Sequence, residues 1–289
     1  MSVIFTRIAL ILGILLQTQS YASEPLDQEI VNIDHETYIE EPDGSYIIPP
    51  LETAKNPMEK ALIIIPGGLV PNHHYLALAK EIQKNIGFKL WVGILSCKRT
   101  ANLCSPIGPN AINTKTYILT IQEKISERAQ TLISSRDLFI AGHSLGGQSA
   151  FLAANEMEDV GGVILWASYV NKNLNNFNYP ILTVGAELNK GSAKMARMAE
   201  IYGEHLSAVS THGDTYAVQQ KPVIILPKIN HSDFSRGFFV RGDVESELEP
   251  RQATEIIAKT TSEFLKIHSV DDEVQIAEST GYQIGRAHV

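Results

Sequence analysis

The sequence is poor in cysteine and in basic residues. Two cysteines among 289 residues are too few for a disulfide-rich scaffold or for a metal site built from cysteines. Lys and Arg total 24 against 32 Asp and Glu, a net charge of -8. Because nucleic-acid binding depends on Lys and Arg at phosphates, this balance predicts no nucleic-acid partner. No cofactor motif and no cluster of metal ligands is recognisable, so we expect neither a cofactor nor a metal.

Long hydrophobic runs are also lacking. The apolar run Ile8–Leu16 is shorter than the roughly 20 residues that cross a bilayer, even with its apolar neighbours included. It follows Arg7 and precedes Ser20-Tyr21-Ala22, which has small residues at the two positions that a signal peptidase reads. We therefore predict a signal peptide over residues 1–22, with an uncleaved anchor as the alternative. The mature protein would be secreted or periplasmic, with no stable membrane span.

Export gives the two cysteines a predicted role. Cys97 and Cys104 flank the polar segment Lys98–Leu103, and in an oxidising compartment they can form a disulfide. A loop this short would contribute about 2.5 kcal/mol on the chain-entropy model. The alternative is a pair of free thiols. Neither cysteine stands in a motif with a histidine that would indicate a nucleophile, so the pair is interpreted as structural.

The rest of the chain has enough apolar material for a folded core, since 44% of its residues are hydrophobic and 19% are charged. Short apolar runs rich in β-branched residues predict strands buried on both faces, and longer segments between them predict helices. The predicted strands are 61–66, 90–95, 138–142, 163–167, 180–185 and 223–226, and the predicted helices are about 74–86, 114–131, 145–157, 191–206 and 251–267. This alternation predicts an α/β domain over 23–268, with a mostly parallel central sheet and helices on both faces. The Pro-Asp-Gly turn within Tyr38–Ile48 predicts an antiparallel hairpin at the sheet edge.

One motif carries chemistry. Gly142-His143-Ser144-Leu145-Gly146-Gly147 is a G-x-S-x-G sequence that follows a predicted strand and opens a predicted helix. Such a turn exposes the serine hydroxyl above the sheet, and its glycines are needed because side chains would crowd the strained backbone. Ser144 is the candidate nucleophile, and a serine in an ordinary glycine-rich turn is the alternative.

With this motif in its context, the chain from about residue 50 to 268 resembles an α/β-hydrolase. The resemblance implies an oxyanion hole with one amide from the residue after the nucleophile and one from a loop after an early strand. Here the first donor would be Leu145. Pro66-Gly67-Gly68-Leu69 follows the strand at 61–66 and supplies Gly68 or Leu69 as the second donor. Losing one such donor typically costs 10²–10³ in rate.

The family order of nucleophile, acid and histidine, with the histidine after the last strands, selects the general base. His231 has this position, just after the strand at 223–226, and would take the Ser144 proton and return it to the leaving group. His205 and His212 are weaker candidates. His143 is interpreted as structural, because its side chain should point away from the Ser144 hydroxyl. His73 and His74 are candidates for lining the pocket near the oxyanion loop.

The acid departs from the family pattern. Gly185-Ala186-Glu187-Leu188-Asn189 resembles a G-G-E-L-D motif of some dienelactone-hydrolase-like and chlorophyllase-like members, with Asn189 where the aspartate is usual. An amide cannot stabilise an imidazolium as a carboxylate does. Glu187 is the nearest carboxylate and the preferred acid. The alternative is that Glu187 only supports its loop and that the acid is absent or comes from elsewhere in the chain.

The substrate class follows from spacing and from the resemblance. Only Ser168–Tyr179 separates two predicted strands where many lipases and epoxide hydrolases insert a lid, so no large lid insertion is expected. The sequence thus predicts an exported serine esterase acting on a small-molecule or lipid-like ester through an acyl-enzyme. An acyltransferase with the same site, and a non-catalytic binding protein that keeps the fold, remain alternatives. The oligomeric state is open.

The carboxyl-terminal tail has no core pattern from residue 269 onward. Its last six residues, Ile284–Val289, match the translation of one frame of a common sequencing adapter. We interpret them as a conceptual translation that ran off the end of a sequenced fragment, so we expect the natural protein to continue beyond about residue 283 with an unknown segment. His288 is excluded as a catalytic residue for the same reason. A genomic copy encoding these six residues before a stop codon would contradict this interpretation.

Overall fold

A computed structural model describes residues 37–97, 113–170, 172–189, 220–240 and 242–269, with Glu200 and Gly203. The predicted signal peptide, the predicted helix 191–206 apart from those two residues, Cys104, His205, His212 and the tail beyond residue 269 lie outside the described residues. The chain divides into units at residues 1–32 and 33–289, and everything below concerns the second unit.

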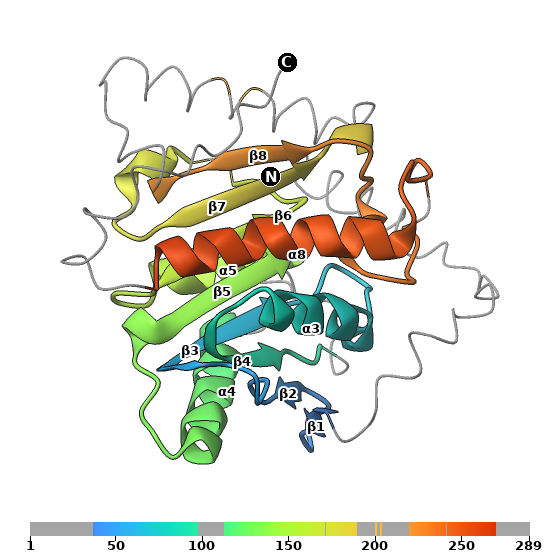
Figure 1. Ribbon diagram of the computed structural model, residues 1–289. Helices are drawn as coiled ribbons and strands as arrows, with labels where there is room; N and C mark the ends of the chain where they lie inside the picture. Colours follow the sequence, from blue (N-terminus) through green and yellow to red (C-terminus); the bar gives the residue numbers. More distant parts are fainter. Residues whose placement is uncertain are drawn as a thin grey trace, which may run out of the picture. The chain divides into compact units, whose positions relative to one another are not determined.

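An eight-stranded sheet forms the centre of this unit (Figure 1). Its strands, in chain order, are β1 Ile39–Glu40, β2 Tyr46–Ile48, β3 Asn56–Ile65, β4 Phe88–Ile94, β5 Leu138–His143, β6 Gly162–Trp166, β7 Ile181–Ala186 and β8 Val223–Leu226. Across the sheet their order is β1-β2-β4-β3-β5-β6-β7-β8. Strands β3 to β8 are parallel, whereas β2 runs antiparallel to both β1 and β4. The predicted parallel sheet and the edge hairpin are both confirmed.

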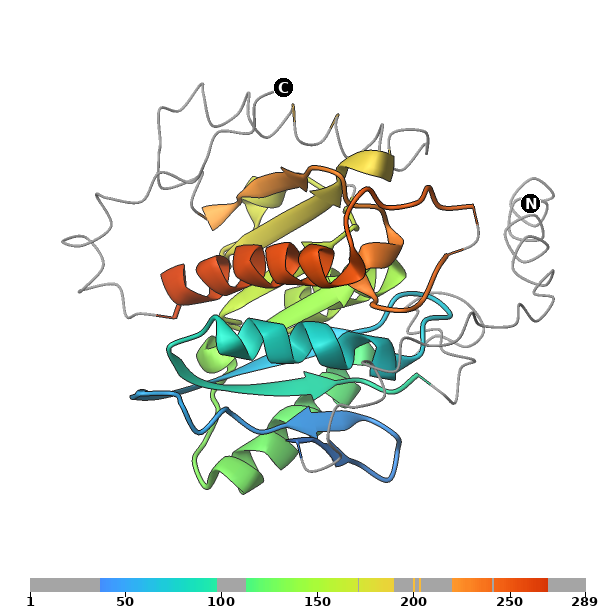
Figure 2. The same ribbon diagram turned by 45° about the vertical axis from the view of Figure 1, so that its right-hand side comes forward.

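Helices cover the sheet on both faces (Figures 1 and 2). They are α3 Leu76–Lys84, α4 Thr114–Ala129, α5 Leu145–Asn155 and α8 Pro250–Ile267, and the short 3₁₀ turns include η2 Asn72–Tyr75, η5 Leu174–Asn176, η6 Glu187–Asn189 and η7 Ser232–Phe234. Side chains of α3 and α8 share one apolar cluster, and those of α4 and α5 share the other. Along β3 the fully buried side chains alternate between these clusters, which explains why an unbroken apolar run is needed there.

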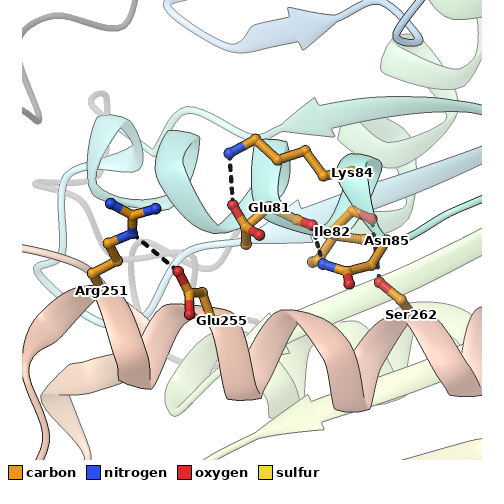
Figure 3. Close-up of polar contacts among 7 residues, drawn as sticks. All are labelled: Glu81, Ile82, Lys84, Asn85, Arg251, Glu255 and Ser262. Carbon is orange, nitrogen blue, oxygen red and sulfur yellow. Dashed lines mark hydrogen bonds and ion pairs between the residues drawn. The ribbon is translucent and has the colours of Figure 1, made fainter. Parts of the chain in front are cut away.

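Helices α3 and α8 lie side by side on one face of the sheet (Figure 3). The hydroxyl of Ser262 on α8 donates a hydrogen bond of 3.2 Å to the carbonyl of Ile82 in the last turn of α3. Since Ile82 and Ser262 are both buried, this bond satisfies polar groups that water does not reach. The two helices are therefore joined by apolar packing and by a specific polar contact.

A buried carboxylate forms ion pairs between the β1–β2 hairpin and α4. Glu41, in the turn after β1, is 7% exposed and forms ion pairs of 2.9 Å with Lys124 and 2.5 Å with Arg128. Burial alone raises the pKa of the Glu41 carboxyl, but the hydrogen bonds and charges of these two side chains outweigh it and hold the pKa below its usual value. This contribution to stability is present above the pKa of the unfolded chain and is lost as the pH falls through the lowered value.

The topology gathers several loops at one edge of the sheet. Because β3, β5, β7 and β8 are parallel, the loops that follow them leave the sheet at the same edge, where ligands bind in open α/β sheets. The connection from β6 to β7 is short and contains only the 3₁₀ turn η5, so no large lid is inserted there. Among the described helices, none combines the length and the apolar character that a bilayer span requires.

Candidate active site

Ser144 lies on the sharp turn between β5 and α5. Its backbone has φ 53° and ψ -117°, a strained conformation for a residue with a side chain. Two contacts hold it there: the Ser144 amide donates to the Trp166 carbonyl at 2.9 Å, and the Ser168 hydroxyl donates to the Ser144 carbonyl at 2.6 Å. The residue is partly exposed. This backbone is the strand-turn-helix geometry that the motif predicts for a nucleophile.

The glycines around Ser144 are required by close contacts. A Cβ atom on Gly142 would lie 2.2 Å from the Gly146 carbonyl oxygen, and one on Gly146 would lie 2.3 Å from the Ile65 carbonyl oxygen. A Cβ atom on Gly147 would lie 2.4 Å from the side chain of Ser168. Real Cβ atoms do not approach other atoms this closely, so each glycine has a steric reason. The contact of Gly146 with the end of β3 also brings the first turn of α5 against the oxyanion loop.

The predicted oxyanion loop, residues 66–69, follows β3 and contains a left-handed residue, Leu69, with φ 66°. The Gly67 amide donates to the Tyr75 hydroxyl at 2.8 Å, and the Val70 amide donates to the Gly67 carbonyl at 3.2 Å. The Gly67 amide is therefore already bonded to Tyr75. The candidate oxyanion donors from this loop remain the amides of Gly68 and Leu69. The third candidate donor, Leu145, is the first residue of α5, where helix amides lack intrahelical acceptors.

His231 lies in the loop after β8, immediately before η7. Its main-chain oxygen accepts a hydrogen bond of 3.0 Å from Nε2 of His143, the residue before Ser144, and the two imidazole rings are 4.7 Å apart. The loop is braced from within, because Asn230 and Asp233 exchange hydrogen bonds of 2.8 and 2.9 Å. The structure thus brings the His231 backbone against the residue next to Ser144.

Two carboxylates contact this loop. Glu187, just after β7, accepts a hydrogen bond of 3.1 Å from the Lys228 amide. Asp243 accepts hydrogen bonds of 2.7 Å from both the amide and the hydroxyl of Ser232, the neighbour of His231. The Asn189 side chain lies outside the described residues. Glu187 therefore supports the loop that carries His231, which is the alternative role considered for it. Its role as the catalytic acid stays a prediction.

His143 has the contacts of a structural residue. It is fully buried, with Nδ1 at 2.8 Å from the Tyr75 hydroxyl and its ring 5.7 Å from the stacked ring of Phe234. His74, the residue before Tyr75, is also buried, and Nδ1 of its ring bonds to the Arg236 carbonyl at 2.8 Å. Burial lowers the pKa of His74 to about 4, although the Arg236 carbonyl opposes the shift. His74 is therefore neutral near pH 7 and connects η2 to the loop after η7.

Sequence reasoning missed Tyr75 and Asp243. Neither stands in a motif, and both matter only through partners that are distant in the sequence, so no local signal marks them. Cys97 is buried, but Cys104 lies outside the described residues, so their pairing stays a prediction. Within the described ranges, no group of three or more His, Cys, Asp or Glu side chains is arranged to hold a metal ion.

Comparisons with known proteins found a family model and several solved structures that are similar to this chain. Residues 115–255 match the model of the alpha/beta hydrolase family. Similar solved structures include the hormone-sensitive lipase homologue EstE7 from a metagenome library, at 13% identity and TM-score 0.49 over 81% of this chain and 86% of that one. Another is a ferulic acid esterase from Streptomyces cinnamoneus, at 15% identity and TM-score 0.47 over 74% and 68%. No curated protein is similar enough in sequence to match.

Three features of the chain point to the same fold. The mostly parallel sheet with helices on both faces, the G-x-S-x-G turn between β5 and α5 and the family-model match are found in the same chain. The dienelactone-hydrolase-like or chlorophyllase-like subtype stays a prediction. The described sheet and helices form an α/β-hydrolase fold, and residues 115–255 match the alpha/beta hydrolase family.

Proposed function

We propose that this protein is a serine hydrolase that cleaves carboxylic esters, with Ser144 as nucleophile, His231 as general base and Glu187 as the acid. The observation that carries the proposal is the strained backbone of Ser144 at the carboxyl end of β5. A strained turn that presents a serine beside a helix N-terminus costs stability and is retained where it serves a reaction. The match of residues 115–255 to the alpha/beta hydrolase family supports a hydrolase.

The proposed reaction has two halves. The Ser144 oxygen attacks the ester carbonyl carbon while His231 accepts the hydroxyl proton, and the carbonyl oxygen becomes an oxyanion. The amides of Leu145 and of Gly68 or Leu69 donate hydrogen bonds to that oxyanion. The C–O bond to the alcohol then breaks, and His231 returns its proton to the leaving alcohol. Water, deprotonated by His231, attacks the acyl carbon of the acyl-enzyme. The C–O bond to Ser144 then breaks as His231 returns the proton to the serine oxygen, and the carboxylic acid is released.

The short β6–β7 connection bears on the substrate. Its residues form a polar loop with one 3₁₀ turn, rather than the apolar cap that many lipases carry over the nucleophile. We propose a small-molecule or otherwise accessible ester, since no inserted cap is present in this connection to shield a long acyl chain from water.

A fluorophosphonate probe tests the nucleophile directly. We expect the purified wild-type protein to be labelled at one site and Ser144→Ala to be unlabelled, because only an activated serine attacks such phosphonates. Intact mass and peptide mapping give the site, and circular dichroism shows that the variant is folded. Wild-type protein that is folded and unlabelled would contradict the enzyme and favour a binding protein. Labelled protein that transfers acyl groups to alcohols in preference to water would favour the acyltransferase.

We also propose that the chain is exported, cleaved after Ala22 and closed by a Cys97–Cys104 disulfide. The burial of Cys97 supports a structural cysteine. The intact mass of the exported product is expected to lack residues 1–22 and two hydrogens, and reduction with alkylation should then modify both cysteines. A product that retains residues 1–22, or whose thiols alkylate without reduction, would contradict the corresponding part of the proposal.

A further inference from the structure

A buried hydrogen-bonded chain connects the three backbone segments of the candidate site. It begins at the Gly67 amide in the oxyanion loop, which donates to the Tyr75 hydroxyl at 2.8 Å. The Tyr75 oxygen is 2.8 Å from Nδ1 of His143, and Nε2 of His143 is 3.0 Å from the His231 carbonyl oxygen. Tyr75 and His143 are both fully buried, so water does not compete for these bonds.

The direction of each bond in this chain follows from its ends. A carbonyl oxygen only accepts, so Nε2 of His143 carries a proton toward His231. In the neutral imidazole Nδ1 is then the acceptor, and Tyr75 donates its hydroxyl proton to it. Burial raises the pKa of Tyr75, although hydrogen bonds from Gly67 and Ser235 partly oppose this, so the hydroxyl keeps its proton. Gly67, Tyr75, His143 and His231 thus form one directional sequence of donors and acceptors.

Tight packing leaves this chain little freedom. A Cβ atom on Gly67 would lie 2.8 Å from Nδ1 of His143, so the oxyanion loop lies directly on the imidazole. The Phe234 ring stacks on the same imidazole, with the two ring centroids 5.7 Å apart. A separate contact, from Nδ1 of His74 to the Arg236 carbonyl at 2.8 Å, joins η2 to the segment that follows η7. Movement of the oxyanion loop relative to the His231 loop would break the connection that runs from Gly67 through Tyr75 and His143 to His231.

We propose that Tyr75 and His143 are positioning residues that fix the oxyanion loop and the His231 backbone on either side of Ser144. The proposal rests on the proposed function, because those segments supply the oxyanion donor, the nucleophile and the base. The two side chains are hydrogen-bonded to the peptides of Gly67 and His231 and act through them. Displacing a reacting group by about 1 Å can cost 10²-fold in rate, so the effect should appear in kcat more than in KM.

The first test compares two variants that each remove one buried hydroxyl. Tyr75→Phe leaves the Gly67 amide and Nδ1 of His143 without their partner, whereas Ser262→Ala removes the α8–α3 bond to Ile82 (Figure 3). We expect both variants to lower the Tm, and only Tyr75→Phe to lower kcat for ester hydrolysis, by about 10- to 100-fold with little change in KM. Equal kcat values in Tyr75→Phe and wild type would overturn the proposal.

The second test uses rescue by a conservative variant and does not depend on Tyr75→Phe folding. The His143→Gln side chain keeps one donor for the His231 carbonyl and one acceptor for the Tyr75 hydroxyl, whereas His143→Leu keeps neither. We expect His143→Gln to retain clearly more of the wild-type kcat than His143→Leu at matched Tm. Equal kcat values in the two variants would count against positioning. A wild-type protein that neither reacts with fluorophosphonate nor hydrolyses esters would instead refute the proposed function and, with it, this inference.

Discussion

Replacing His231 by alanine is expected to lower kcat for ester hydrolysis by about 10⁴- to 10⁶-fold, because Ser144 would lose the group that takes its proton. The fold should persist, since the loop is held through backbone and side-chain bonds of Asn230, Ser232 and Asp243. Steady-state kinetics on a chromogenic ester measure the loss. Added imidazole should restore part of the rate, as expected for a missing base.

The matched control is His268→Ala. His268 follows the C-terminal end of α8, the end opposite to the loop that carries His231. It removes a histidine whose ring packs on Phe264 at 4.6 Å and should leave kcat unchanged. Wild-type activity in His231→Ala would refute His231 as the base. It would direct attention to His205 and His212, which lie outside the described residues.

The same kinetics decide the role of Glu187. The Glu187→Gln side chain can still accept the Lys228 amide bond, so it preserves support of the loop but cannot stabilise an imidazolium. A loss of 10² or more in kcat would identify Glu187 as the acid. Full activity would leave it as a support, and Asp243→Asn would then be the next variant to test, since Asp243 is the other carboxylate bonded beside His231.

Gly146→Ala is expected to lower the free energy of unfolding by about 3 kcal/mol or more, or to abolish folding. The new Cβ atom would lie 2.3 Å from the Ile65 carbonyl oxygen and 2.4 Å from that of Pro66. Both are backbone atoms, so no side chain can move aside to relieve the contact. Any folded protein that forms should have α5 pushed away from the oxyanion loop and should react slowly with fluorophosphonate.

Gly87→Ala provides the control for this prediction. A Cβ atom at Gly87 would meet no atom within 4 Å, so this variant should fold with a Tm near that of the wild type, while Gly146→Ala should not. Thermal unfolding followed by circular dichroism, with soluble yield, measures both. A Gly146→Ala protein with the Tm and labelling rate of the wild type would show that the contact relaxes without cost.

The predicted elements agree with the structure where apolar periodicity is strong. Strands β5, β7 and β8 begin and end within one residue of their predicted bounds. The reason is that strands buried on both faces must be continuously apolar. Boundaries moved where polar residues take part. β3 begins at Asn56 with a register shift between Asn56 and Glu59, and the predicted helix at 74 begins at Leu76 because η2 precedes it.

The sequence by itself determined the α/β-hydrolase fold class, the strand-turn-helix around Ser144 and the position of His231 after the last described strand. These features depend on local patterns of residue type and spacing. Only the tertiary structure decided that Tyr75 and His143 connect the site segments and that Asp243 lies beside His231. The physical reason is that a hydrogen bond depends on distance in space and carries no signal along the chain. Tyr75 is 68 residues from His143, and His143 is 88 from His231, and only the parallel sheet brings them together.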